Sequence, residues 1–400
     1  MTDHGPARRM LVLVALAEFL AMTLWFSATA VTPALVAAFH MTGGEAAWLT
    51  MAVQAGFVAG TLVTALFNLP DVVNARHLFA IGCLVGAAAN AGVTVSAGPG
   101  TAIALRLVTG VALAGVYPPG MKIVAGWFQH RRGTALGILI GALTIGSAFP
   151  HLLAAFSAEL PWREVLFTTS GLALAAGILI VLGVRDGPYV AAHAPFDPRA
   201  ALEVWTNRGT RLATFGYLGH MWELYAVWTW IAAFAAASLG AWATAHGRTL
   251  AAGSGSLAAF VAIGSGAIGA AVAGVLADRL GKARVAAWSM IVSGLCSLGA
   301  GLVFGAPPAW LYALIIVWGV AVVADSAQFS ALVTEYSPRD HVGTALTVQT
   351  CAGFVLTMIS IRLLPIAAHA VGWQWGFVVL VPGPLFGVLA MRGLRRMPLT

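Results

Sequence analysis

Long apolar stretches separated by short polar turns run along the whole chain. Each stretch is long enough to cross the hydrocarbon core of a membrane as a helix, which takes about 20 mostly apolar residues. The pattern predicts an all-α polytopic membrane protein with twelve transmembrane helices in two six-helix pseudo-repeats. The apolar runs lie at about residues 10–39, 46–69, 77–97, 100–126, 133–157, 164–184, 211–239, 250–276, 283–305, 308–334, 341–366 and 373–393.

Composition supports a lipid environment. The 400 residues are 60% hydrophobic and 9% charged, whereas soluble domains carry about 25% charged residues. The net charge of +7 comes from basic residues in the loops, so it indicates membrane topology and does not point to nucleic acid. The three cysteines fall in separate apolar runs, without the spacing of a disulfide framework or a metal site.

The basic residues of the loops predict how the chain crosses the membrane. If the N-terminus is cytoplasmic, all the loop arginines and lysines except Arg163 and Arg248 fall on the cytoplasmic side. Removing one helix would destroy this bias, which supports the count of twelve. We therefore expect a multi-pass protein of the cell membrane, of the bacterial inner-membrane type, with both termini cytoplasmic and the first apolar run retained as a helix.

Repeated motifs divide the chain into two halves. Gly133-Thr-Ala-Leu136 opens the fifth run and Gly343-Thr-Ala-Leu346 opens the eleventh. We expect an N-terminal six-helix bundle at 1–184, a cytoplasmic linker at 185–210, which is the most polar long stretch, and a C-terminal six-helix bundle at 211–400. Parallel six-helix repeats are a known arrangement of secondary transporters.

Two motifs carry a resemblance to a known family. The loop Gly274-Val-Leu-Ala-Asp-Arg-Leu-Gly-Lys-Ala-Arg284 lies between the eighth and ninth runs, and Phe67-Asn-Leu-Pro-Asp-Val-Val-Asn-Ala-Arg76 is its degraded partner in the first half. The fourth run contains Arg106-Leu-Val-Thr-Gly110. With the two-half layout, these motifs resemble the major facilitator superfamily of secondary transporters, loosely its bacterial permeases for small organic anions such as cyanate.

The resemblance implies a gating role for the loop residues. The family pattern predicts a cytoplasmic clasp in which Asp278, Arg279 and Arg284 join helices eight, nine and eleven. Its first-half counterpart keeps only Asp71 and Arg76. The alternative interpretation is ordinary interface charge that only sets topology.

Ionisable side chains inside apolar runs are the best candidates for function, because each costs at least about 2.5–3.5 kcal/mol to insert at mid-bilayer. The resemblance implies that helices one, four, seven and ten line the pore, and six of these candidates fall in those runs. The full set is Glu18, Arg106, Lys122, His151, His220, Glu223, Asp325 and Arg362.

Glu223 and His220 are three residues apart, so they share a helix face, and we expect them to form a proton-coupling pair. Glu18 is an alternative coupling acid or a partner for Arg106 or Lys122. Asp325, three residues before Gln328, is expected to bind cargo or to neutralise Lys122.

The family pattern ties Arg106 either to proton transfer or to the backbone carbonyls of helix one. Lys122 either meets an anionic cargo or extends to the membrane surface. Trp25, Tyr117 and Tyr225 are the predicted aromatic residues of the cavity, and Tyr117 with Pro118-Pro119 is expected to break helix four. Structural packing remains the alternative role for each of these side chains.

These features predict a secondary active transporter that moves a small organic solute, preferably an organic anion, by alternating access with proton coupling. The rival transport hypothesis is export of an amphipathic or cationic compound. The alternative without transport is a membrane sensor or assembly factor. There is no Gly-x4-Gly-Lys-Ser/Thr loop and no nucleophile–base set. We therefore expect no enzyme activity, no cofactor and no metal, and we expect a monomer whose partners are the solute, protons and the bilayer.

Overall fold

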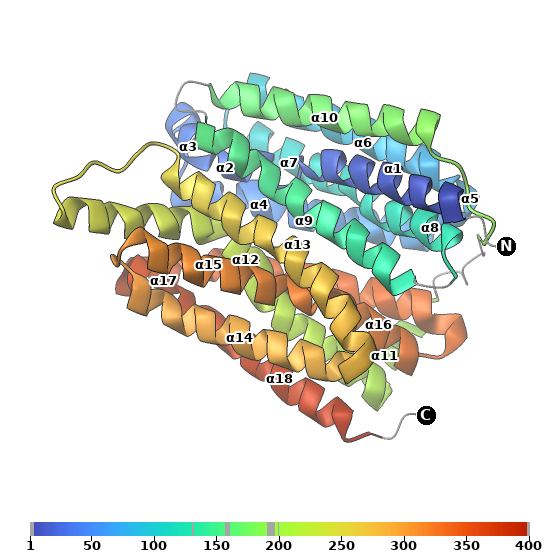
Figure 1. Cartoon of the computed structure of the whole chain (residues 1–400). Coiled ribbons are helices and arrows are strands. Elements are labelled where there is room, and N and C mark those ends of the chain that lie inside the picture. The colour runs from blue at the N-terminus through green and yellow to red at the C-terminus, as the bar shows by residue number, and fades with distance from the viewer. Residues whose placement is uncertain (1–3, 130–131, 157–160, 190–196, 199, 398–400) are drawn as a thin grey trace. The chain divides into compact units, whose positions relative to one another are not determined.

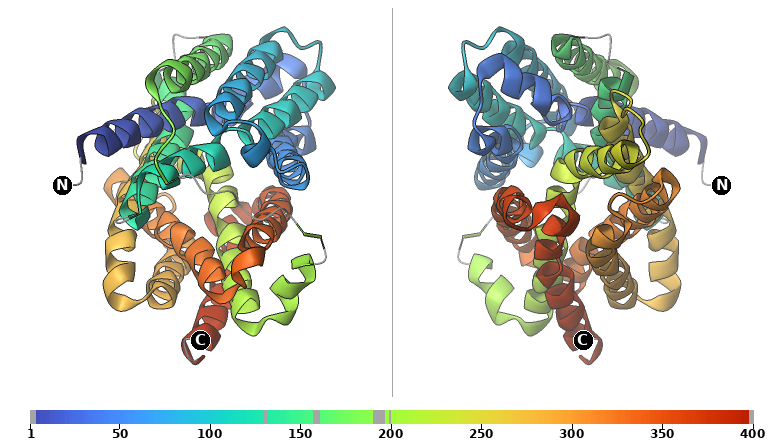
Figure 2. Two further views of the ribbon diagram at one scale, coloured as in Figure 1. Left: turned by 90° about the vertical axis from the view of Figure 1, so that its right-hand side faces the viewer. Right: turned by 90° about the vertical axis from the view of Figure 1, so that its left-hand side faces the viewer.

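A computed structural model describes residues 4–129, 132–156, 161–189, 197–198 and 200–397, and within this part the chain is helical without strands. The described chain separates into two compact units. Unit 1 comprises Met1–Pro150 and Pro161–Asp197, and unit 2 comprises His151–Leu160 and Pro198–Thr400. The boundary at Asp197 falls inside the expected linker. The helices of each unit run along a common direction in Figure 1 and are seen toward their ends in Figure 2.

Unit 1 contains the helices of the first six apolar runs. They are α1 (His4–Met22), α2 (Ser27–Ala30), α3 (Thr32–Phe39), α4 (Gly43–Leu66), α5 (Leu69–Val72), α6 (Ala75–Gly92), the 3-10 turn η1 (Val93–Val95), α7 (Pro99–Leu113), α8 (Tyr117–Trp127), α9 (Arg132–Phe156, which enters unit 2 after Pro150) and α10 (Trp162–Gly183).

Unit 2 contains the remaining helices. They are η2 (Ala200–Leu202), α11 (Glu203–Thr206), α12 (Arg208–Ala245), α13 (Ser254–Leu280), α14 (Lys282–Val303), α15 (Pro308–Ala324), α16 (Ser326–Tyr336), η3 (Arg339–His341), α17 (Val342–Gly376), η4 (Phe377–Leu380) and α18 (Pro382–Arg395).

Ten helical segments of the described residues are long and apolar enough to span a membrane. The longest, Val342–Arg395, covers the eleventh and twelfth apolar runs and is interrupted at Gly372, where φ is 79°. The first run is not among the ten, because its long helix, α1, carries three charged side chains, Arg8, Arg9 and Glu18. These two features account for the difference from twelve, and the exact number of spans stays a prediction.

The first, fourth and tenth predicted runs each contain a break. Helix four ends at Leu113 and restarts as α8 at Tyr117, as Pro118 and Pro119 predict, since proline has no N–H to continue the hydrogen-bond ladder. Helix ten also breaks, at Asp325, but without a proline. The break in helix one, at residues 23–26, was not expected from the sequence.

The two units repeat one close helix contact. In unit 1, a Cβ on Gly110 of α7 would lie 2.1 Å from the carbonyl oxygen of Val53 on α4. In unit 2, a Cβ on Gly319 of α15 would lie 1.8 Å from the carbonyl oxygen of Ala262 on α13. Glycine alone permits this approach, and small residues at such contacts are how helices associate in lipid. The residue separation is the same in both pairs, so the duplication extends to backbone packing.

The ends of the expected linker are both anchored. At its start, the N–H of Tyr189 donates to the carbonyl of Gly126 at 2.9 Å, and the indole of Trp127 donates to the carbonyl of Arg185 at 2.8 Å. At its end, the amide of Asn207 caps α12. The polar stretch that we predicted as a linker therefore has one end anchored in unit 1 and the other end anchored in unit 2.

Candidate functional site

Glu223 lies in a hydrogen-bonded cluster inside unit 2, and its side chain is only 1% exposed. Ser293 of α14 donates to Oε2 at 2.8 Å, and Ser297, one turn later, donates to Oε1 at 2.8 Å. The indole N–H of Trp318 on α15 donates to Oε1 at 2.9 Å. Among the described residues no lysine or arginine forms an ion pair with Glu223, so only neutral donors solvate this carboxylate.

The Ser293 hydroxyl has a second acceptor within reach, the carbonyl of Met290 at 3.3 Å. A serine hydroxyl both donates and accepts, whereas an indole N–H only donates. An ionised Glu223 takes a hydrogen bond from Ser293. A Glu223 protonated on Oε2 can donate to Ser293, which then turns its own proton to Met290. The cluster thus accommodates both protonation states through one hydroxyl rotation.

His220 has a different partner from the one we predicted. Its Nδ1 lies 2.9 Å from Oδ1 of Asp325, and its Nε2 lies 3.2 Å from Oγ of Ser326. Both partners stand at the break between α15 and α16, from which they reach α12. His220 and Glu223 are therefore close on α12 but bind separate groups. Gln328 is buried, and the contact that connects it with Asp325 is its backbone N–H donating to the Asp325 carbonyl at 2.9 Å.

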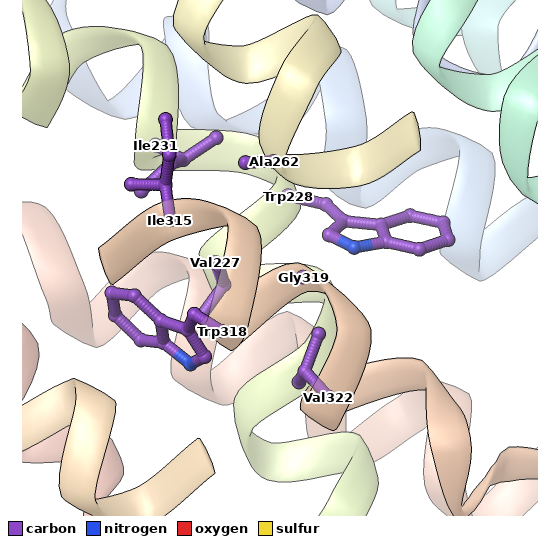
Figure 3. Close-up of a pocket in the computed structure, with 8 residues that line it drawn as sticks. All are labelled: Val227, Trp228, Ile231, Ala262, Ile315, Trp318, Gly319 and Val322. Carbon is purple, nitrogen blue, oxygen red and sulfur yellow. The ribbon is translucent and has the colours of Figure 1, made fainter. Parts of the chain in front are cut away.

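An aromatic cluster follows Glu223 along α12. The ring of Tyr225 lies 5.6 Å from that of Trp228 and 5.1 Å from that of Phe354 on α17. Trp228 and Trp318 line an apolar pocket between α12, α13 and α15 that is too narrow for a water molecule (Figure 3). The ring of Trp318 therefore lines this narrow pocket, while its indole N–H donates to Glu223.

Arg106 is fully buried in unit 1 and holds open the break in helix one. All its described acceptors are uncharged, and most belong to the broken segment or its flank. Its Nη1 donates to the carbonyl of Leu24 at 3.1 Å, to Oγ of Ser27 at 3.1 Å and to Oδ1 of Asn90 at 3.0 Å. Its Nε donates to the carbonyl of Leu49 at 3.3 Å, and its Nη2 donates to the carbonyl of Trp25. These contacts correspond to the second of the two roles that the family resemblance implies for this arginine.

Asn90 of α6 completes this cluster and was not among the residues predicted from the sequence. Its Oδ1 accepts from Ser27 as well as from Arg106. Its Nδ2 donates to three oxygens of α10, at distances of 3.0 to 3.1 Å, on Leu166, Thr169 and Ser170. An asparagine inside an apolar run was the available signal, because a buried amide must find partners in lipid.

Glu18 of α1 is also fully buried, but its environment differs from that of Glu223. A Cβ on Gly120 would lie 2.5 Å from Oε2, which places the carboxyl group against the first turn of α8. Neither carboxylate oxygen has a hydrogen-bond partner among the described residues. The physical reason is local: Pro118 and Pro119 occupy the start of α8 and have no N–H to donate.

The other predicted residues of unit 1 lie near these groups. Trp25 is buried, with its ring 5.1 Å from that of Phe57. Tyr117 is half-buried at the start of α8 and lies within electrostatic range of the Glu18 carboxyl group. Lys122, on the same helix, is half-buried.

The two predicted gating loops differ. In unit 1, Arg76 forms an ion pair with Asp186 at 3.3 Å and donates to the carbonyl of Val184 at 2.8 Å, which joins the start of α6 to the end of α10. Asn74 donates to the same Asp186 at 2.7 Å. The side chain of Asp71 lies outside the described residues.

In unit 2, the ion pair of the loop is Lys282 with Glu335, which joins the start of α14 to the end of α16. Asp278 and Arg279 are exposed, and Arg284 is half-buried. The described part of the chain contains no ion pair between Asp278 and either arginine. The gating role of these three residues stays a prediction. Among the described residues, no group of three or more histidine, cysteine, aspartate or glutamate side chains could hold a metal ion.

Comparison with known proteins gives a family and a fold. The family model described as Major Facilitator Superfamily matches residues 14–264 and again residues 215–399. A stretch of 185 residues is 29% identical to the MFS-type transporter pytF of Aspergillus terreus, and it covers 45% of this chain and 58% of that protein. A mutant of the nucleoside transporter NupG has a similar fold, with a TM-score of 0.72 and 15% identity, over 96% of this chain and 99% of that chain.

Proposed function

This chain belongs to the Major Facilitator Superfamily and is a multi-pass membrane transporter, and we propose that it moves a small organic solute by alternating access coupled to protons. The family and the fold support transport of a small molecule. The curated relative adds no cargo, because its name states none and the match covers 58% of its length. The proton coupling and the solute class are our proposal from the described side chains.

The observation that carries proton coupling is the Glu223 cluster. A buried carboxylate without a basic partner is costly, and an ionisable group inside a membrane span is a functional candidate by default. Ser293 lets this carboxyl group gain and lose a proton without breaking the cluster. His220, one turn before Glu223 on α12, and its partner Asp325 at the break between α15 and α16 are the second candidate for proton coupling. Glu18 is the candidate in unit 1.

The contacts of Arg106 weaken the support for an anionic cargo. Arg106 and Lys122 on one helix favoured an organic anion, but Arg106 directs its donors to buried protein groups. The proposal of an organic anion therefore depends on Lys122. The rival, export of a cationic or amphipathic compound, is favoured by the three buried acids Glu18, Glu223 and Asp325, none of which pairs with a described lysine or arginine.

Reconstituted protein in proteoliposomes tests this function. We expect Glu223→Gln to abolish accumulation driven by a pH gradient while solute exchange at equal pH continues, because exchange needs no net proton movement. Glu164→Gln is the matched control, since this acid lies exposed at the start of α10.

The outcomes separate the alternatives. Exchange of carboxylates would support the proposed cargo, and exchange of cations alone would contradict it. Full uptake driven by a pH gradient in a variant with Glu18, Glu223 and Asp325 all changed to amides would overturn the proposed proton coupling. If such a variant keeps the cellular function of the protein without transport, the protein is a sensor or assembly factor.

A further inference from the structure

One face of α18 changes from apolar to basic toward its end. Leu385 is 60% exposed and Leu389 is 55% exposed, and both Arg392 and Arg396 are exposed. Spacings of four, three and four residues place these side chains on one side of the helix. A membrane-facing helix with this order meets acyl chains first and the charged headgroup region at its end.

A row of aromatic rings continues this face onto the neighbouring helices. The ring of Phe386 on α18 lies 5.3 Å from that of Phe215 on α12, which lies 6.3 Å from that of Trp205 on α11. Phe386 is 46% exposed and Trp205 is 36% exposed, so the row has an outer edge available to another molecule. Tryptophan is typical of the membrane–water boundary, where its ring is apolar and its N–H is polar.

Further arginines lie at the start of α12, beside the end of α18. Arg211 donates through Nη1 to the carbonyl of Trp205 at 2.8 Å, which leaves its other N–H groups available. A Cβ on Gly393 of α18 would lie 3.4 Å from the side chain of Leu212, so the two helix ends adjoin (Figure 1). We name the resulting surface the α12–α18 basic face: Arg208, Arg211, Arg392, Arg395 and Arg396.

Acidic side chains of the described residues form no ion pair with this face. Glu335, an acid at the same end of unit 2, is paired with Lys282. The face therefore offers several guanidinium donors that match a phosphate group, beside an exposed apolar and aromatic strip.

We propose that the α12–α18 basic face binds an anionic phospholipid. The arginines bind the headgroup phosphate, and one acyl chain lies along Leu385, Phe386 and Leu389. Charge complementarity selects an anionic headgroup over a zwitterionic one, because several arginines leave an excess of positive charge on the phosphate. Trp205 belongs to the segment that precedes α12, so the bound lipid contacts the linker end of unit 2. This inference does not depend on proton coupling.

The full chain in detergent, titrated with phosphatidylglycerol or phosphatidylcholine, tests the proposal through the thermal unfolding midpoint. A ligand that binds the folded state raises this midpoint. We expect phosphatidylglycerol to raise it at lower concentration than phosphatidylcholine. Arg208→Gln combined with Arg211→Gln should raise the half-maximal phosphatidylglycerol concentration about 30-fold, from the usual contribution of two surface arginines.

The matched control is Arg8→Gln combined with Arg9→Gln, which removes the same charge from exposed arginines on α1. It should leave the response unchanged. Phe386→Ala, which alters no charge, should also weaken binding, and it provides a test if the double variant does not fold. The proposal is wrong if both lipids act alike, if the control loses as much, or if inorganic phosphate gives the full response.

Discussion

At the residue scale, the two buried glutamates show how local chemistry decides the state of a carboxyl group. Glu223 has three neutral donors, whereas Glu18 has none among the described residues. Both were selected from the sequence for the same reason, a charge inside an apolar run. Their difference comes from the neighbours, because serines on α14 can donate and the prolines at the start of α8 cannot.

Ser293→Ala should lower proton-driven uptake by about 10-fold or more. The variant removes the hydroxyl that adjusts to both states of Glu223, and a hydrogen bond to a charged group contributes about 1.5–3 kcal/mol. Uptake under an imposed pH gradient measures the effect. Ser289→Ala, one turn earlier on α14, is the control, and equal loss in both variants would contradict a specific role for Ser293.

Asn90→Ala should destabilise unit 1 by about 2–4 kcal/mol, because it leaves buried donors and acceptors without their partner. A fall in the thermal unfolding midpoint of several degrees measures this loss. Thr94→Ala is the comparison, since that hydroxyl only bonds the carbonyl of Ala91 within its own segment. A midpoint equal to that of the wild type would show that Asn90 is dispensable to the cluster.

At the element scale, the breaks in helices one, four and ten carry the polar groups of interest. The open segment of helix one supplies carbonyls to Arg106, and the break in helix ten carries Asp325 to His220. Irregular backbone at membrane depth persists only where its polar groups are satisfied by protein or water. The break in helix four was predictable from two prolines, whereas the other two have no such signal in the sequence.

Gly110→Ala and Gly319→Ala should each prevent normal folding, because the added methyl group would overlap a backbone carbonyl that cannot move independently of its helix. The expected cost is about 3 kcal/mol or more, as for strong overpacking. The yield of monodisperse protein on size exclusion reports the effect. Gly171→Ala and Gly274→Ala, where nothing lies within 4 Å, should behave as wild type. Tolerance at positions 110 and 319 would disprove the close approach.

At the scale of the whole molecule, more of the fold than of the candidate site could be predicted from the sequence. The helical class was readable because burying about 20 apolar residues in lipid dictates helix formation regardless of detail. The family was readable from the loop motif at 274–284 and from Arg106-Leu-Val-Thr-Gly110. The tight contact of Gly110 with Val53 in unit 1 and that of Gly319 with Ala262 in unit 2 join residues at the same separation along the chain, as a duplication implies. The partner of His220 was not readable, because the spacing along α12 favoured Glu223 and gave no indication of Asp325.

The orientation predicted from the basic loops can be tested with single cysteines at positions 98 and 281. The three native cysteines, two of them buried, would first be replaced. A membrane-impermeant maleimide should label position 98 in intact cells and position 281 only after permeabilisation, because five predicted spans separate them. The reverse labelling would invert the topology, and equal labelling would contradict the number of spans.

By itself, the sequence determined the helical membrane-protein class and which few ionisable side chains have to be explained. Those conclusions follow from the cost of placing charge in hydrocarbon, which is the same for any arrangement of the helices. Only the tertiary structure decided the partners: Arg106 with the opened helix one, Asp325 with His220, and Glu223 with two serines and a tryptophan. A hydrogen bond requires two atoms within about 3 Å, and that proximity arises from helix packing between segments far apart in the chain.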